Sequence, residues 1–152
     1  MAEGDIQKIT DRLRRLCSRR EYSKYDILKK ATEALDGDRE SATKILDVLV
    51  AEKYVDDLRY ATAYAREKAM ISGWGETKIR YMLSAKRIDR SLVDQALTEI
   101  DSDKADSRLQ KLLENKAKTL KADPQIRLKL LRFALGRGYQ YDDVVRVLQD
   151  IL

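Results

Sequence analysis

The sequence predicts an all-α protein of three tandem three-helix repeats, and three observations support this fold class. Apolar residues recur every three or four positions almost throughout, which is the spacing of one face of an α-helix. Of the 152 residues, one is proline, six are glycine and 38% are charged, a composition typical of helices with solvated faces. A long helical segment followed by two shorter ones recurs three times, with a period of about fifty residues.

The first repeat, residues 5–55, contains three apolar stripes at helical spacing. Ser23 with Asp26 three residues later predicts a capped helix start, and the stretch DGDRES predicts a polar turn. The stripes are Ile6, Ile9, Leu13 and Leu16; Tyr25, Leu28, Ala31 and Leu35; and Ala42, Ile45, Leu49 and Tyr54.

The second repeat, residues 56–100, and the third, residues 103–152, keep the same helix order. In the third repeat, Asp123 followed by Pro124 predicts an N-cap and the first helical residue. In LGRGY, Gly136 and Gly138 are predicted to end a helix through left-handed backbone, with Arg137 exposed between them. The predicted helices are DLRYATAYAREKAM, ETKIRYMLSAKRI and DRSLVDQALTEI, then KADSRLQKLLENKAKTL, PQIRLKLLRFALGRGY and YDDVVRVLQDIL.

Two pairs of adjacent carboxylates, Asp56-Asp57 and Asp142-Asp143, each follow an aromatic residue and precede an apolar, basic run. We interpret Asp56 and Asp142 as caps of the helices that follow them. The alternative is an enzyme that holds Mg²⁺ between paired carboxylates. Neighbouring helical residues point about 100° apart, however, so adjacent carboxylates converge on one ion only where the backbone is irregular.

The chain lacks the residues of the common catalytic sites. It contains no histidine and one cysteine, which excludes Ser-His-Asp and Cys-His sites and the usual ligands of zinc and haem. No Gly-rich phosphate loop is present. We therefore predict no enzymatic activity, no cofactor and no metal. Cys17, on an apolar helix face, is interpreted as a packed thiol, with a reactive thiol as the alternative.

Nothing in the sequence suggests a membrane protein or an exported one. The first residues, MAEGDIQKIT, lack the basic and apolar regions of a signal peptide, and no segment approaches the ~18 apolar residues of a membrane span. We expect a cytoplasmic protein.

The positive charge favours an acidic partner, nucleic acid first. The net charge is +5 with a pI near 9.2. Residues 8–30 hold nine Lys or Arg against three acids, and residues 108–137 hold nine against two. Lys8, Arg12, Arg15 and Arg19 share one helix face, away from the apolar stripe. Such a face would bind phosphates without reading sequence, and the alternative is an ordinary solvated face.

The aromatic residues are a weaker indication of nucleic-acid binding than the charge. Trp74, between Gly73 and Gly75, could stack on a base, but packing against the next helix is the interpretation we prefer. Five tyrosines at helical spacing are expected at the rims of the core: Tyr22, Tyr25, Tyr60, Tyr64 and Tyr81.

Four segments taken together resemble the RecX family of bacterial proteins, over nearly the whole chain from about Leu13 to Leu148. The most specific parts are Tyr54 to Ala61, Gly75 to Leu83, and Arg137 to Tyr139. The segments are LCSRREYSKYDILKK, VLVAEKYVDDLRYATAYAREK, GWGETKIRYMLSAKRIDRSLVDQAL and LLRFALGRGYQYDDVVRVL.

The resemblance implies an elongated, curved array of three tandem three-helix repeats that lies in the groove of the RecA–DNA filament. It implies a regulator that inhibits RecA's ATP hydrolysis, strand exchange and coprotease activities, and so modulates recombination, DNA repair and the SOS response. The partners would be the RecA filament and its single-stranded DNA, or DNA bound weakly and directly, with the protein acting as a monomer. The expected contact residues are Lys8, Arg12, Arg15, Arg19, Lys78, Arg87, Arg127, Arg132 and Arg137. The alternative is a helical DNA-binding protein that acts independently of RecA.

Overall fold

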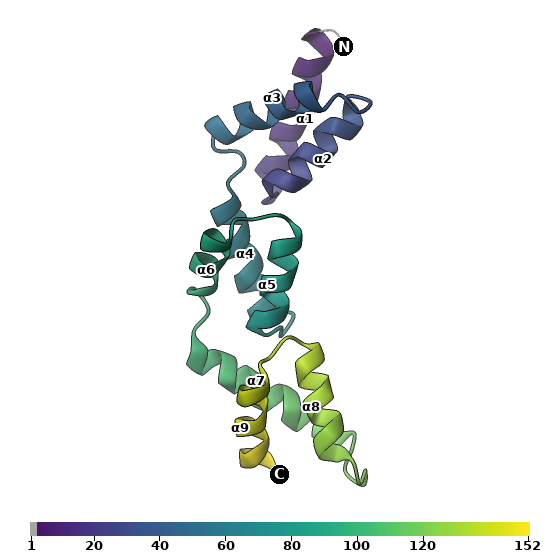
Figure 1. Ribbon diagram of the computed structural model, residues 1–152, viewed down its shortest axis with the longest axis vertical. Coiled ribbons are helices and arrows are strands. Elements are labelled where there is room, and N and C mark those ends of the chain that lie inside the picture. Colours follow the sequence, from purple (N-terminus) through teal and green to yellow (C-terminus); the bar gives the residue numbers. More distant parts are fainter. Residues whose placement is uncertain (1–2) are drawn as a thin grey trace.

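The structure is a computed structural model that describes residues 3–152, and within that range the chain forms nine α-helices and no strand. The contacts between helices divide them into three groups of three, and Figure 1 shows the groups following one another along a long axis, with the two termini at opposite ends. The predicted all-α, elongated array of three-helix repeats is therefore confirmed. The helices are α1 (Glu3–Arg19), α2 (Lys24–Ala34), α3 (Arg39–Ala51), α4 (Asp57–Met70), α5 (Glu76–Ala85), α6 (Arg90–Leu97), α7 (Ser102–Lys118), α8 (Ile126–Gly136) and α9 (Tyr141–Ile151).

Each group of three helices encloses its own hydrophobic core. We call α1–α3 the N-terminal bundle, α4–α6 the middle bundle and α7–α9 the C-terminal bundle. Leu13, Ile27 and Leu49 are fully buried in the first core. Ile79 and Leu83 are fully buried in the second, while the third is built around Leu109, Leu113 and Leu130. The helix pairs that pack extensively all lie within one bundle, as expected of a repeat array in which each unit buries an apolar stripe locally.

Local capping chemistry sets several helix starts as predicted. The Ser23 hydroxyl accepts a hydrogen bond from the backbone N–H of Asp26 at 3.1 Å, which caps α2. The Asp56 carboxylate accepts one from the backbone N–H of Arg59 at 2.9 Å, which caps α4. Both use a side-chain oxygen to satisfy an N–H group that has no partner inside the helix.

Two predicted caps are wrong. The helix α9 begins after Gln140, whose backbone is extended, so Asp142 and Asp143 lie inside its first turn and no side chain caps it. They can still stabilise the positive end of the helix dipole there. The helix α8 begins after Gln125, because Asp123 and Pro124 belong to a preceding turn in which the Asp123 carboxylate accepts from the Gln125 N–H at 2.8 Å.

Side chains join the N-terminal bundle to the middle bundle. The Asp57 carboxylate accepts a hydrogen bond from the backbone N–H of Lys24, at the start of α2, at 2.8 Å. Two ion pairs accompany it: Lys86 to Asp26 at 2.7 Å and Arg59 to Glu21 at 2.7 Å. We call this contact the first junction.

Backbone groups join the middle bundle to the C-terminal bundle. The N–H of Gly75 donates to the carbonyl of Arg137 at 2.8 Å, and the N–H of Thr77 donates to that of Gly138 at 3.0 Å. The Tyr139 hydroxyl also donates to the Gly73 carbonyl at 3.1 Å. We call this contact the second junction.

The second junction requires glycine at two positions. A Cβ on Gly75 would lie 2.5 Å from the carbonyl of Gly138, and a Cβ on Gly138 would lie 2.2 Å from the Cβ of Lys78. Gly138 also has a φ of +95°, in the region that side chains rarely adopt. The prediction for Gly138 is thus correct, whereas Gly136 is the last residue of α8 and has no positive φ.

Candidate functional site

A row of four exposed cations runs along α1, as the sequence predicts. Lys8, Arg12, Arg15 and Arg19 are all exposed, and none forms an ion pair within residues 3–152. At 1.5 Å per residue the row is about 16 Å long. Three of these cations border a shallow depression of about 360 Å³ that also includes Asp11. We call these four residues the α1 row.

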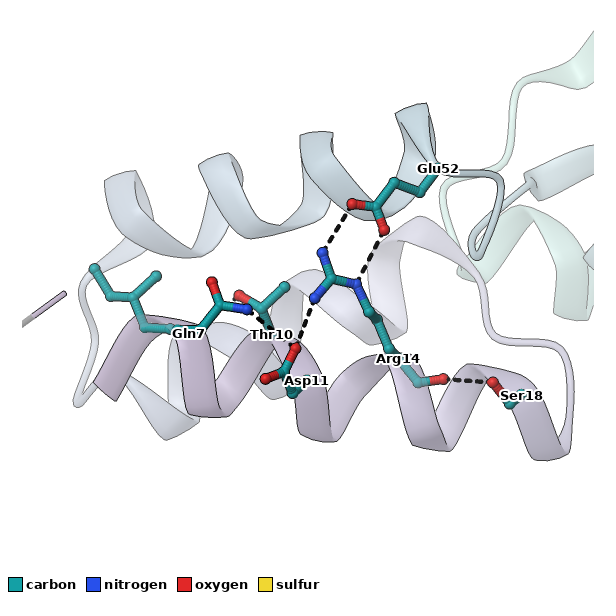
Figure 2. Close-up of polar contacts among 7 residues, drawn as sticks. Gln7, Thr10, Asp11, Arg14, Ser18 and Glu52 are labelled. Atoms are coloured by element: carbon teal, nitrogen blue, oxygen red, sulfur yellow. Dashed lines mark hydrogen bonds and ion pairs between the residues drawn. The ribbon is translucent and has the colours of Figure 1, made fainter. Parts of the chain in front are cut away.

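A polar network on another side of α1 holds the helix in place and leaves the α1 row free. Arg14 donates to both carboxylate oxygens of Glu52, at 2.8 and 3.0 Å, and to Asp11 at 2.7 Å (Figure 2). The hydrogen bonds from Arg14 lower the pKa of the Glu52 carboxyl, and Glu52 in turn raises the pKa of Arg14. The acids near α1 therefore neutralise Arg14 and not the α1 row.

Cations that face solvent at this spacing suit a chain of phosphates. Like charges on one helix face repel one another, so a polyanion that neutralises them gains free energy and releases counterions. Lysine and arginine side chains that meet only phosphates carry no information about base sequence. The α1 row can therefore bind a nucleic-acid backbone without sequence preference, and such binding would weaken with salt.

The predicted contact residues of α8 do not form a comparable row. Arg127 and Arg132 are exposed and make no ion pair in the described part of the chain. They are five positions apart, however, so they point about 140° away from each other around the helix. Between them, Lys129 pairs with Asp123. The structure leaves both arginines accessible without bringing them together.

Three other predicted contact residues are held in contacts within the protein. The Lys78 ammonium lies 4.3 Å from the centre of a Trp74 ring, and the Arg87 guanidinium lies 5.3 Å from that of Tyr25. Arg137 lies over Phe133 and donates to the Ser72 carbonyl at 3.3 Å. The expectation that Arg137 is exposed is wrong, because it is half-buried at the second junction.

The adjacent carboxylates have structural partners. Asp56 caps α4, Asp57 accepts from the Lys24 N–H, and Asp143 pairs with Arg146 at 3.1 Å. Burial raises the pKa of Asp57, while the hydrogen bond from the Lys24 N–H opposes that rise. The role of Asp57 was missed in the sequence, because its partner lies 33 positions away and no local pattern connects the two.

Most of the aromatic residues and the thiol pack as predicted. Trp74 lies edge-on to Tyr64, with ring centres 6.4 Å apart, at the margin of the middle core. Tyr60 is buried, which raises its pKa to about 12. Cys17 packs against the first core, and burial raises its pKa, which disfavours the reactive thiolate. Tyr81 is the exception: it is 73% exposed rather than at the rim of a core.

Among the helices described here, none is both long enough and apolar enough to cross a membrane.

Comparisons with known proteins agree on one family. Models of the second and third three-helix domains of RecX match residues 56–97 and 104–148. The regulatory protein RecX of Vibrio parahaemolyticus is 35% identical over 132 residues, covering 85% of this chain and 82% of the relative. That of Clostridium tetani is 31% identical over 119 residues, covering 76% of this chain and 54% of the relative. The chain thus spans about half the length of the clostridial relatives it matches.

Solved structures show the same fold. A crystal structure of regulatory protein RecX superimposes with a TM-score of 0.85 at 23% identity, covering 95% of this chain and 72% of the other. RecX from Lactobacillus salivarius gives a TM-score of 0.83 at 21% identity, covering 98% and 97% of the two chains.

Proposed function

Because this chain belongs to the RecX family of regulatory proteins, we propose that it binds the RecA filament on single-stranded DNA and inhibits RecA. The activities it lowers are ATP hydrolysis, strand exchange and coprotease action, and through them it modulates recombination and DNA repair. It acts as a monomer in the cytoplasm, by binding and without chemistry of its own.

The observation that carries this proposal is family membership along most of the chain, together with the exposed, unpaired α1 row. An elongated array of bundles presents a long surface, which suits a filament better than a compact ligand. The filament contains a polyanion, and the α1 row provides cations at one end of the array to meet it.

The direct test is a titration of the purified protein into RecA, single-stranded DNA and ATP. We expect ATP hydrolysis to fall at substoichiometric to near-stoichiometric amounts of the protein. The variant Arg12→Ala with Arg15→Ala should require more protein for the same inhibition. Arg39→Ala with Lys44→Ala, which removes two exposed cations from α3, serves as the charge-matched control. Unchanged ATP hydrolysis across the titration would refute the inhibitory function.

The unpaired α1 row also favours a second candidate, a DNA-binding protein that acts without RecA. Salt-sensitive binding to bare DNA, combined with no binding to the filament beyond what its DNA explains, would select this candidate. Binding to the filament that survives when bare DNA competes would exclude it.

A further inference from the structure

An open cleft of about 430 Å³ lies where the N-terminal bundle meets the middle bundle. One wall comes from the connection between α1 and α2, which contributes Arg20 and Tyr22. A second wall is one face of α2, and Lys86, at the C-terminal end of α5, closes the cleft from the middle bundle. None of these residues belongs to the α1 row, so the cleft is a separate feature.

The cleft gathers more positive charge than its acids neutralise. Arg20, Lys29 and Lys30 are exposed, and none forms an ion pair within the described residues. Lys86 is the fourth cation, and its ammonium lies 2.7 Å from the Asp26 carboxylate. One further acid, Glu33, lines the cleft and makes no ion pair in that range.

Tyr22 holds two of these cations close to each other. The Arg20 guanidinium lies 4.6 Å from the centre of the Tyr22 ring, and the Lys30 ammonium lies 5.6 Å from it. A ring face attracts cations, with an energy of about 0.5–1 kcal/mol at exposed sites. That attraction offsets part of the repulsion between Arg20 and Lys30 and favours the positions of both at the cleft.

We propose that this cleft binds the phosphodiester backbone of single-stranded nucleic acid and that the bound phosphate ties the N-terminal bundle to the middle bundle. Three of the four cations are lysines, which meet phosphate as point charges, whereas planar recognition of carboxylates is characteristic of arginine. The cleft is open to solvent, and its volume of about 430 Å³ admits backbone phosphates while the bases stay outside. The single-stranded form is the one that the proposed function supplies.

The coupling between the bundles follows from where the cations come from. Lys29 and Lys30 belong to α2, while Lys86 follows α5, so a strand whose phosphates meet lysines of both helices bridges the first junction. The Lys86 ammonium already donates a hydrogen bond to the Asp26 carboxylate. Asp26 and the phosphate compete for the same ammonium, so Asp26 lowers the affinity of the cleft for phosphate while its ion pair with Lys86 stabilises the first junction.

The test measures binding of a fluorescein-labelled oligothymidylate to the protein alone by fluorescence anisotropy over a range of salt concentrations. If each lysine meets one phosphate, Lys29→Ala with Lys30→Ala lowers the magnitude of the salt slope by about 1.4, and the affinity at 0.1 M salt by about 25-fold. The control, Lys104→Ala with Lys111→Ala, removes the same charge from exposed positions of α7 and should change both far less.

A second pair of variants separates a binding site from a structural ion pair. Asp26→Asn should tighten binding, because it frees Lys86 and removes a negative charge, whereas Lys86→Ala should weaken it. If the ion pair between Lys86 and Asp26 served only to hold the junction together, the two variants would change binding in the same direction. Circular dichroism of each variant verifies that its helices remain intact.

Three outcomes would overturn the proposal: an equal loss of affinity in the α7 control, weakened binding in Asp26→Asn, or displacement of the oligonucleotide by poly-glutamate at an equal concentration of charge. The choice of nucleic acid as ligand rests on the proposed function. The assay contains no RecA, however, so a protein that binds the oligonucleotide as expected but leaves RecA uninhibited would refute the proposed function and preserve the cleft.

Discussion

The two junctions occupy equivalent places in the array but are built from different chemistry. In both, the end of the second helix of one bundle meets the start of the second helix of the bundle before it. At the first junction Lys86 and Arg87 meet Asp26 and Tyr25 through side chains. At the second, the backbone of residues 137–138 meets that of residues 75–77. Equivalent positions in the repeats can therefore form either an ionic contact between side chains or a hydrogen-bonded contact between backbones.

Because of this difference, we expect the two junctions to respond differently to salt. Ion pairs between partly exposed side chains contribute little at ordinary salt and weaken as salt rises. Backbone hydrogen bonds between closely packed glycines have no net charge, and their geometry leaves little freedom for adjustment. We therefore expect the middle and C-terminal bundles to move as one body, while the N-terminal bundle changes its orientation with ionic conditions and ligands.

The largest effect is expected from Gly138→Ala at the second junction. The substitution forces a side chain into left-handed backbone and places its Cβ 2.2 Å from the Cβ of Lys78. We expect the free energy of unfolding to fall by about 2–5 kcal/mol, from backbone strain and overpacking together. Urea denaturation followed by circular dichroism measures this change.

Gly37→Ala is the matched control, because Gly37 has a φ of +93° but no atom within 4 Å of the added Cβ. It should lose only the strain contribution, about 1–2 kcal/mol. If the free energy of unfolding fell equally in the two variants, the close backbone approach at the second junction would contribute nothing to the destabilisation.

An intermediate effect is expected at Asp57, in the first junction. Asp57→Ala leaves the Lys24 N–H without its acceptor and should cost about 1–2 kcal/mol. Asp57→Asn keeps an acceptor oxygen without the buried charge, so it should be tolerated far better. Urea denaturation of both variants at neutral pH gives the comparison.

The same carboxylate predicts a dependence on pH. Its folded pKa lies above the ordinary value, so the protonated form favours the folded state. That contribution is complete below the unfolded pKa and is lost as pH rises through the folded pKa. The stability of Asp57→Asn relative to the parent protein should therefore increase over this interval, and a difference that stays constant from acid to neutral pH would contradict the assignment.

The smallest effect on stability is expected from removing the ionic bridges of the first junction. Glu21→Gln with Asp26→Asn neutralises the partners of Arg59 and Lys86 and should cost less than about 1 kcal/mol. We expect small-angle X-ray scattering to show a broader distribution of interatomic distances, as the parent protein should at high salt. Glu99→Gln removes the ion pair between Glu99 and Arg66 inside the middle bundle and should leave the distribution unchanged.

Features encoded within a few residues could be predicted from the sequence. The helical period reveals the stripe around Leu13 and the α1 row on a separate face of the helix, and short-range capping reveals the roles of Ser23 and Asp56. Caps were misplaced where a turn or extended residue intervened, as at Asp123 and Asp142, because the side chain alone does not say where helical backbone begins.

Features that depend on contacts between bundles could not be predicted. The partner of Asp57 lies in another bundle, and the cleft closed by Lys86 combines segments about sixty positions apart. Arg137 reads as an exposed cation between two glycines, yet its carbonyl and guanidinium both serve the second junction. The role of a residue in a repeat array therefore depends on the neighbouring bundle as much as on the residue itself.

The turn before α8 differs from the corresponding turn before α5. In the middle bundle the corresponding turn offers the N–H groups of Gly75 and Thr77 to the carbonyls of the next bundle. In the C-terminal bundle, Pro124 has no N–H, and the N–H of Gln125 donates to Asp123 within its own turn. The counterpart of the Gly75 N–H is therefore already bonded within its own turn. The C-terminal bundle thus does not offer a second molecule the donor that the middle bundle offers at Gly75, which disfavours repetition of this contact between molecules.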